Sequence, residues 1–128
     1  MTLVPIAVVI LIAVPCHAVA LRIAARLMVD VPVSYRKALG VVAAEYVAVA
    51  AVAITLAGLA GAGVAAIAIG AIAYLAVGAL LIGRSLHLAD GSAVGTGNGV
   101  LIQAIQVPLL LPVAILASYA YDAFGTAA

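Results

Sequence analysis

Residues 64–82 read VAAIAIGAIAYLAVGALLI, and this stretch decides the fold class. It carries no charged side chain, and it is close to the roughly 20 apolar residues that a helix needs to cross a bilayer. Residues 47–54 are also continuously apolar, whereas a membrane-spanning β-strand would alternate apolar and polar residues. Only helices and closed barrels satisfy their own backbone in lipid. The pattern therefore predicts transmembrane helices.

The composition of the chain also indicates a membrane protein. Of its 128 residues, 70% are hydrophobic and 7% are charged, whereas a soluble domain has about 45–50% apolar and about 25% charged residues. A soluble fold of this length could not hide so much apolar surface, because small domains leave much of their area exposed. The net charge is +1 and there is no basic run to grip a phosphate backbone, so we expect no nucleic-acid partner.

Four stretches are long and apolar enough to span a bilayer: residues 3–21 or 3–29, 38–58, 63–83 and 99–121. Pro32 ends the first stretch, because the residue before a proline avoids the α region. A Gly-rich turn at residues 58–63 and a flexible polar loop at residues 89–98 make the other two breaks. We predict an all-α integral membrane protein whose single domain is a bundle of four transmembrane helices.

The basic residues predict the orientation of these helices. All five lie in or beside the first and third connections, namely Arg22, Arg26, Arg36, Lys37 and Arg84. Two crossings separate the two connections, so both lie on one side of the membrane, and the positive-inside rule makes that side cytoplasmic. Both termini are then expected outside the cytoplasm. If the first helix continues past Leu21, Arg26 and Asp30 are one turn apart and would form an ion pair.

The two halves of the chain resemble each other weakly. Gly40-Val41-Val42 follows the first connection as Gly99-Val100-Leu101 follows the third. The fold is then either a tandem pair of helical hairpins that arose by duplication, or a bundle in which an Ala/Val/Gly-rich alphabet produces a chance match.

Four polar residues, His17, Glu45, Gln103 and Gln106, lie inside the predicted spans at similar depths from the cytoplasmic side. Glu45 lies about 12 Å along its helix from Lys37, because each helical residue advances 1.5 Å. We expect these four side chains to form one intramembrane polar layer. It could act as interhelical hydrogen-bonded packing, or as a relay in which Glu45 passes protons or cations.

Small residues recur at helical spacing in the third stretch. Ala62, Ala66, Gly70 and Gly78 lie on one stripe, and such rows let helix backbones approach closely. We predict that this stripe packs against another helix, within the bundle or in an oligomer.

We expect no enzymatic activity and no cofactor. The sequence has no nucleophile beside a base, no acid pair and no phosphate-binding glycine loop. Its single cysteine, Cys16, excludes an internal disulfide and a cysteine-based metal site. His17 and His87 lie at different depths, whereas the two axial histidines of a haem must face each other. We therefore predict neither catalytic residues nor metal ligands.

Residues 23–27 (IAARL) and 30–39 (DVPVSYRKAL) resemble the first loop of small multi-pass membrane proteins of haloarchaea. The resemblance implies a prokaryotic plasma membrane and a four-helix fold, and it carries no catalytic residue across.

These observations predict a structural or accessory membrane subunit, with lipid and either itself or a larger membrane complex as partners. Two other functions are considered. One is a small proton or cation conduit, or a transporter subunit, that uses Glu45. The other is a protein that binds a pigment, lipid or quinone in an apolar cleft between helices.

Overall fold

The computed structural model describes residues 3–60 and 63–125, and all regular structure in these ranges is helical, without strands. The helices are α1 (Leu3–Val29), α2 (Tyr35–Ala60), α3 (Val64–Ser85) and α4 (Thr96–Gly125). Each contains a segment long and apolar enough to cross a membrane: Ala7–Val29, Tyr35–Leu56, Ala68–Ser85 and Thr96–Leu116.

The connection between α1 and α2 is short and well bonded. Of the two extents considered for the first helix, the longer occurs, and α1 ends at Val29. Asp30 then takes a left-handed conformation (φ 51°), which short polar residues tolerate. The prediction of an ion pair between Arg26 and Asp30 is wrong. This turn takes Asp30 out of the helix, and the two side chains form no salt bridge. Val31 and Val33 are buried and anchor the loop to the core.

The second helix begins at Tyr35, three residues before the expected start at Ala38. Ser34 explains the difference, because its hydroxyl accepts a hydrogen bond from the Lys37 amide (3.3 Å). A serine in that position caps the exposed amides of a helix N-terminus. The sequence signal for this boundary is therefore Ser34 itself.

The connection between α3 and α4, expected to be a flexible polar loop, is a hydrogen-bonded turn. Its backbone amides at Val94 and Gly95 donate to carbonyls at Leu86 (2.9 Å) and Gly83 (3.0 Å). At its tip, Asp90 accepts bonds from the amide and hydroxyl of Ser92, which lower the pKa of the Asp90 carboxyl. These bonds hold the start of α4 against the end of α3.

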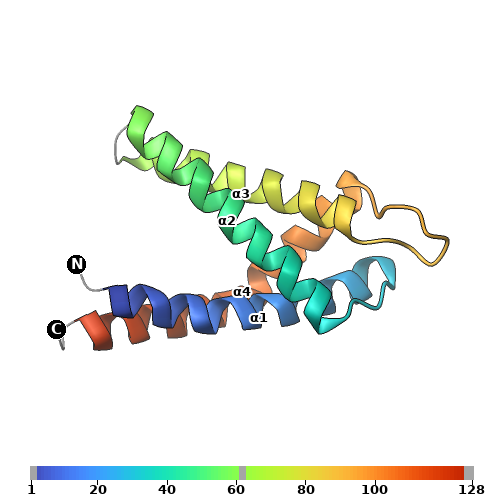
Figure 1. Cartoon of the computed structure of the whole chain (residues 1–128), viewed down its shortest axis with the longest axis horizontal. Helices are drawn as coiled ribbons and strands as arrows, with labels where there is room; N and C mark the ends of the chain where they lie inside the picture. Colours follow the sequence, from blue (N-terminus) through green and yellow to red (C-terminus); the bar gives the residue numbers. More distant parts are fainter. Residues whose placement is uncertain (1–2, 61–62, 126–128) are drawn as a thin grey trace.

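The four helices are arranged as a ring in which each contacts its two neighbours. α1 packs against α2 and α4, and α3 packs against the same two helices. In the described part of the chain, the diagonal pairs make no close backbone approach. The α1–α2 and α3–α4 connections lie at one end, the loop end, whereas α1 and α3 begin and α2 and α4 end at the other, the open end (Figure 1). Towards the open end the molecule parts into two arms, α1 with α4 and α2 with α3 (Figure 1).

The core occupies only the loop half of the molecule. Every buried residue of the described chain falls within residues 17–45 or 78–106. The largest apolar side chains among them are Leu21, Val42, Ile82, Leu86 and Ile102. No described side chain towards the open end is buried. Lipid tails are as apolar as these side chains, so no hydrophobic force draws the arms together.

The glycines that suggested a repeat differ in their surroundings. A Cβ on Gly40 would meet nothing within 4 Å, whereas one on Gly99 would overlap the carbonyl of Ala79. Counted from the starts of α2 and α4, the equivalent of buried Gly99 is buried Ala38. The match that the sequence suggests therefore pairs an exposed position with a buried one.

Candidate functional site: a buried polar cluster

The four residues expected to form a polar layer lie together where the helices cross. His17 comes from α1, Glu45 from α2, and Gln103 and Gln106 from α4. All four are at most 1% exposed. Buried polar groups require partners, because an unpaired one loses its hydrogen bonds to water without replacement.

Hydrogen bonds connect Gln106, Gln103 and Glu45 in a row, and His17 lies next to Glu45. The Gln103 amide donates to Glu45 Oε1 (2.6 Å), and the Gln106 amide donates to Gln103 Oε1 (3.2 Å). His17 Nε2 lies 3.9 Å from Glu45 Oε2. The contact between Glu45 and Gln103 joins α2 to α4, two diagonal helices whose backbones do not approach each other.

A fifth member, Tyr74, comes from α3. Its hydroxyl lies 3.3 Å from His17 Nε2, which joins the other diagonal pair of helices. Tyr46 packs its ring edge-on against the imidazole of His17, with centroids 5.7 Å apart. The sequence did not predict Tyr74 as a member of the polar layer. The sequence signal was Tyr74 itself, a tyrosine inside an apolar span. A buried tyrosine hydroxyl usually finds a hydrogen-bond partner.

Gly78 makes room for the cluster. A Cβ at this position would overlap Glu45 Oε1 and the side-chain amide of Gln103. Its lack of a side chain therefore allows the bond between α2 and α4 to form beside α3. Of the four stripe residues, Gly78 is the one for which the described contacts show close packing.

The rest of the stripe does not pack within the described chain. A Cβ on Gly70 would meet no atom within 4 Å, so the expected contact inside the bundle is not found there. Ala62 and the side chain of Ala66 lie outside the described residues. The tight helix crossing involves Gly83 and Gly99 instead, both nearer the loop end. The sequence does not single out these two glycines, because glycine and alanine are abundant throughout it.

Two buried atoms of the cluster have no hydrogen-bond partner among the described residues, His17 Nδ1 and Gln106 Oε1. One can donate and the other can accept, so they are chemically complementary. His17 and Glu45 can share a proton, since one is a base and the other an acid. They also provide two potential metal ligands, but no third His, Cys, Asp or Glu joins them among the described residues.

Two apolar grooves flank the cluster. One, of about 310 Å³, lies between α3 and α4 and includes Gln103 among apolar residues. The other, of about 580 Å³, lies between α1 and α2 and includes Tyr46. Neither groove is lined by Glu45 or His17. On the loop side, the apolar core covers the cluster.

No protein-family model, curated protein or solved structure matches the chain.

Proposed function

We propose that this chain is a non-enzymatic integral membrane protein that acts as a structural or accessory subunit, packing with copies of itself or within a larger membrane complex. The observation that carries the proposal is the division of the molecule into a closed loop half and an open half in which no described side chain is buried. The open arms present large apolar side chains, including Leu11, Ile54, Ile72 and Leu116, each at least 66% exposed. Such surfaces suit both lipid and another helix.

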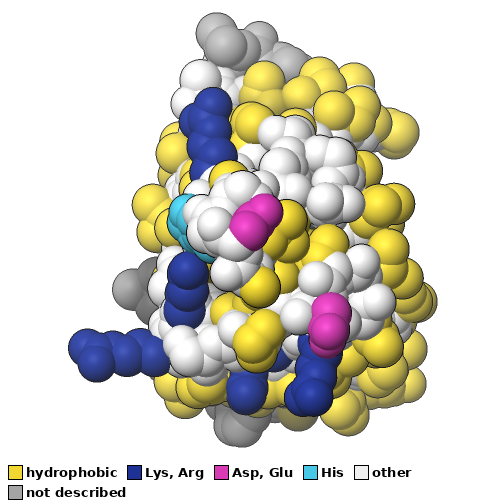
Figure 2. All heavy atoms as spheres, turned by 90° about the vertical axis from the view of Figure 1, so that its right-hand side faces the viewer, with side chains coloured by type: hydrophobic (Ala, Val, Ile, Leu, Met, Phe, Trp, Pro, Cys, Tyr) yellow, Lys and Arg dark blue, Asp and Glu magenta, His cyan; other side chains and the backbone are white. Residues whose placement is uncertain are grey.

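The proposed orientation has the loop end in the cytoplasm and both termini outside a plasma membrane. Lys and Arg side chains gather at the loop end, with acidic side chains among them and apolar ones around the rim (Figure 2). A cationic end is expected on the cytoplasmic side. The 27 residues of α1 extend about 40 Å, which exceeds the roughly 30 Å of hydrocarbon and lets the arginine-bearing turns reach the headgroups.

In this proposal the polar cluster locks the four helices together. It joins both diagonal pairs through side chains, α2 to α4 through Glu45 and Gln103, and α1 to α3 through His17 and Tyr74. Interhelical hydrogen bonds in membranes are worth about 1 kcal/mol each, enough to fix which faces meet. The grooves beside the cluster are apolar, which favours a locking role over a water-filled path.

Oligomeric state tests the proposal, and the glycine stripe offers the variant. We expect the chain to run in mild detergent as an oligomer or with a co-purifying membrane protein. Gly70→Leu should reduce that association, because Gly70 faces open space on an arm. Gly40→Leu is the matched control, since a Cβ on Gly40 would also meet no atom within 4 Å but Gly40 lies in the closed half. Light scattering and crosslinking report the state. A chain that is monomeric at every concentration and purifies alone would overturn the proposal.

A proton or cation conduit is the second candidate function. It is favoured by the adjacent His17 and Glu45, and by the partnerless atoms His17 Nδ1 and Gln106 Oε1. Such groups could pass a proton between them if water reached the cluster from the open end. Ion flux through vesicles containing the chain separates this candidate from the first.

A further inference from the structure

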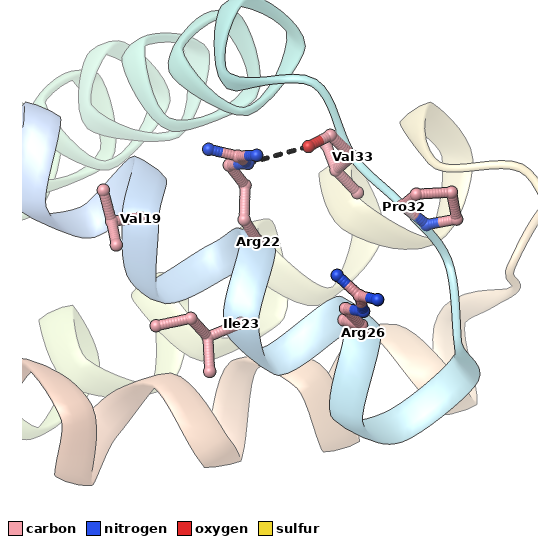
Figure 3. A pocket seen from close by; sticks show the side chains of 6 residues that line it. All are labelled: Val19, Arg22, Ile23, Arg26, Pro32 and Val33. Atoms are coloured by element: carbon pink, nitrogen blue, oxygen red, sulfur yellow. Dashed lines mark hydrogen bonds between the residues drawn. The ribbon is translucent and has the colours of Figure 1, made fainter.

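A pocket of about 290 Å³ lies at the loop end, between the last turns of α1 and the α1–α2 connection (Figure 3). Its lining combines two cationic side chains with apolar ones: Val19, Arg22, Ile23, Arg26, Pro32 and Val33. Neither arginine belongs to the polar cluster. The pocket is therefore a separate site that needs its own explanation.

The two arginines lie on one face of α1, and neither has a salt-bridge partner in the part of the chain that the structure describes. They are one helical turn apart, so their side chains leave α1 in similar directions. Arg22 Nε donates to the Val33 carbonyl (2.9 Å), which positions this guanidinium against the loop and leaves its terminal amino groups available (Figure 3). Within residues 3–60 and 63–125, no carboxylate forms a salt bridge with either arginine.

The pocket also has apolar side chains on α1. Val19 and Ile23 precede Arg22 and Arg26 by one turn and are 45% and 44% exposed. Along α1 from the loop towards the open end, the side chains come in the order Arg26, Ile23, Arg22 and Val19, so cationic and apolar groups alternate beside the pocket. A phospholipid offers a partner for each kind of side chain, an anionic phosphate for the guanidinium groups and acyl chains for the apolar residues.

We propose that this pocket binds the phosphate of an anionic phospholipid in the cytoplasmic leaflet. The planar guanidinium forms paired hydrogen bonds with phosphate oxygens, and two such groups suit a headgroup with a net negative charge. The acyl chains lie along Val19 and Ile23. The site rests on the membrane orientation proposed above. A free phosphate ion offers the same oxygens, so the test includes it.

Lipid retention tests the site. The full chain is reconstituted in phosphatidylcholine vesicles containing a minor fraction of phosphatidylglycerol, extracted in mild detergent, and analysed by mass spectrometry for bound lipid. The wild type should be enriched in phosphatidylglycerol. Arg22→Gln/Arg26→Gln should lower this enrichment by about tenfold or more, because each basic residue near a surface contributes about 1 kcal/mol. Arg26→Gln alone should lower it severalfold, and it breaks no hydrogen bond found within the described residues.

Arg36→Gln/Lys37→Gln is the matched control, because it removes the same charge from the loop end outside the pocket. It should retain phosphatidylglycerol like the wild type. Equal loss in both double variants, or no preference in the wild type, would overturn the site. If inorganic phosphate stabilises the detergent-solubilised chain as much as phosphatidylglycerol does, the ligand is free phosphate and the lipid assignment is wrong. Vesicle flotation reports insertion separately, so a chain that does not float overturns the proposed function itself.

Discussion

Glu45 has one carboxylate oxygen bonded to Gln103 and the other facing His17. If the cluster locks the helices, the hydrogen bond matters and the charge does not. Glutamine keeps an oxygen for the Gln103 amide, and its own amide can face the imidazole. Leucine keeps neither, and it leaves Gln103 buried without its partner. The two substitutions at one position therefore separate bonding from charge.

We expect Glu45→Gln to unfold thermally close to the wild type in detergent, and Glu45→Leu to be less stable by about 1 kcal/mol or more. Circular dichroism during heating measures both. Proton flux in vesicles with an entrapped pH dye supplies the second measurement, with protein-free vesicles as the control. If the wild type conducts and Glu45→Gln folds but does not conduct, the conduit is the correct function and the locking role is insufficient.

The sequence could predict the polar cluster because depth in a helix follows from counting residues. His17, Glu45, Gln103 and Gln106 were expected at one level, and the structure brings them together. Counting gives depth but not direction, since it does not say which face of a helix meets a neighbour. Tyr74 was missed for this reason, and Gly70 was placed on a contact that the described bundle does not make.

Among the elements, the crossing of α3 and α4 depends most on the absence of side chains. Gly99 lies against the backbone carbonyl of Ala79, and Gly83 lies against the backbone of Gly95. Backbone atoms cannot rotate away as a flexible side chain can. An added methyl group at either glycine must therefore push the two helices apart, which would also strain the turn that links them.

Gly99→Ala should destabilise the chain by about 1–3 kcal/mol, the usual cost of forcing an extra methyl group into a packed core. Gly40→Ala is the control, because its Cβ would enter open space and alanine favours the helix by about 1 kcal/mol. Unfolding in increasing denaturing detergent, followed by circular dichroism, compares the two variants. Equal stability of Gly99→Ala and Gly40→Ala would show that α3 and α4 do not cross closely at Gly99.

The helices themselves were predictable because continuous apolar runs leave few alternatives in lipid. The ends of the helices were less predictable. The start of α2, for example, depends on the Ser34 cap and not on hydropathy. The parting of the arms could not be predicted at all. Hydropathy says that a residue suits lipid, but a residue facing lipid and one facing another helix are equally apolar, so the open half has no sequence signature.

The orientation of the whole molecule gives the last prediction. The α1–α2 and α3–α4 connections lie at one end, with all the Arg and Lys residues in the helix turns beside them, and the end of α2 and the start of α3 lie at the other (Figure 1). In a Cys16→Ala background, Ala93→Cys should therefore react with an impermeant thiol reagent only from the cytoplasmic side, because Ala93 is exposed in the α3–α4 connection. Gly63→Cys, exposed at the other end, should react only from outside.

Intact cells and inside-out vesicles measure the two sides, and detergent-treated membranes control for reactivity. If both positions react from the same side, the four helices do not all cross the membrane. If each reacts from the side opposite to that expected, the chain spans the membrane but the orientation is reversed, and the arginine pocket faces the outer leaflet.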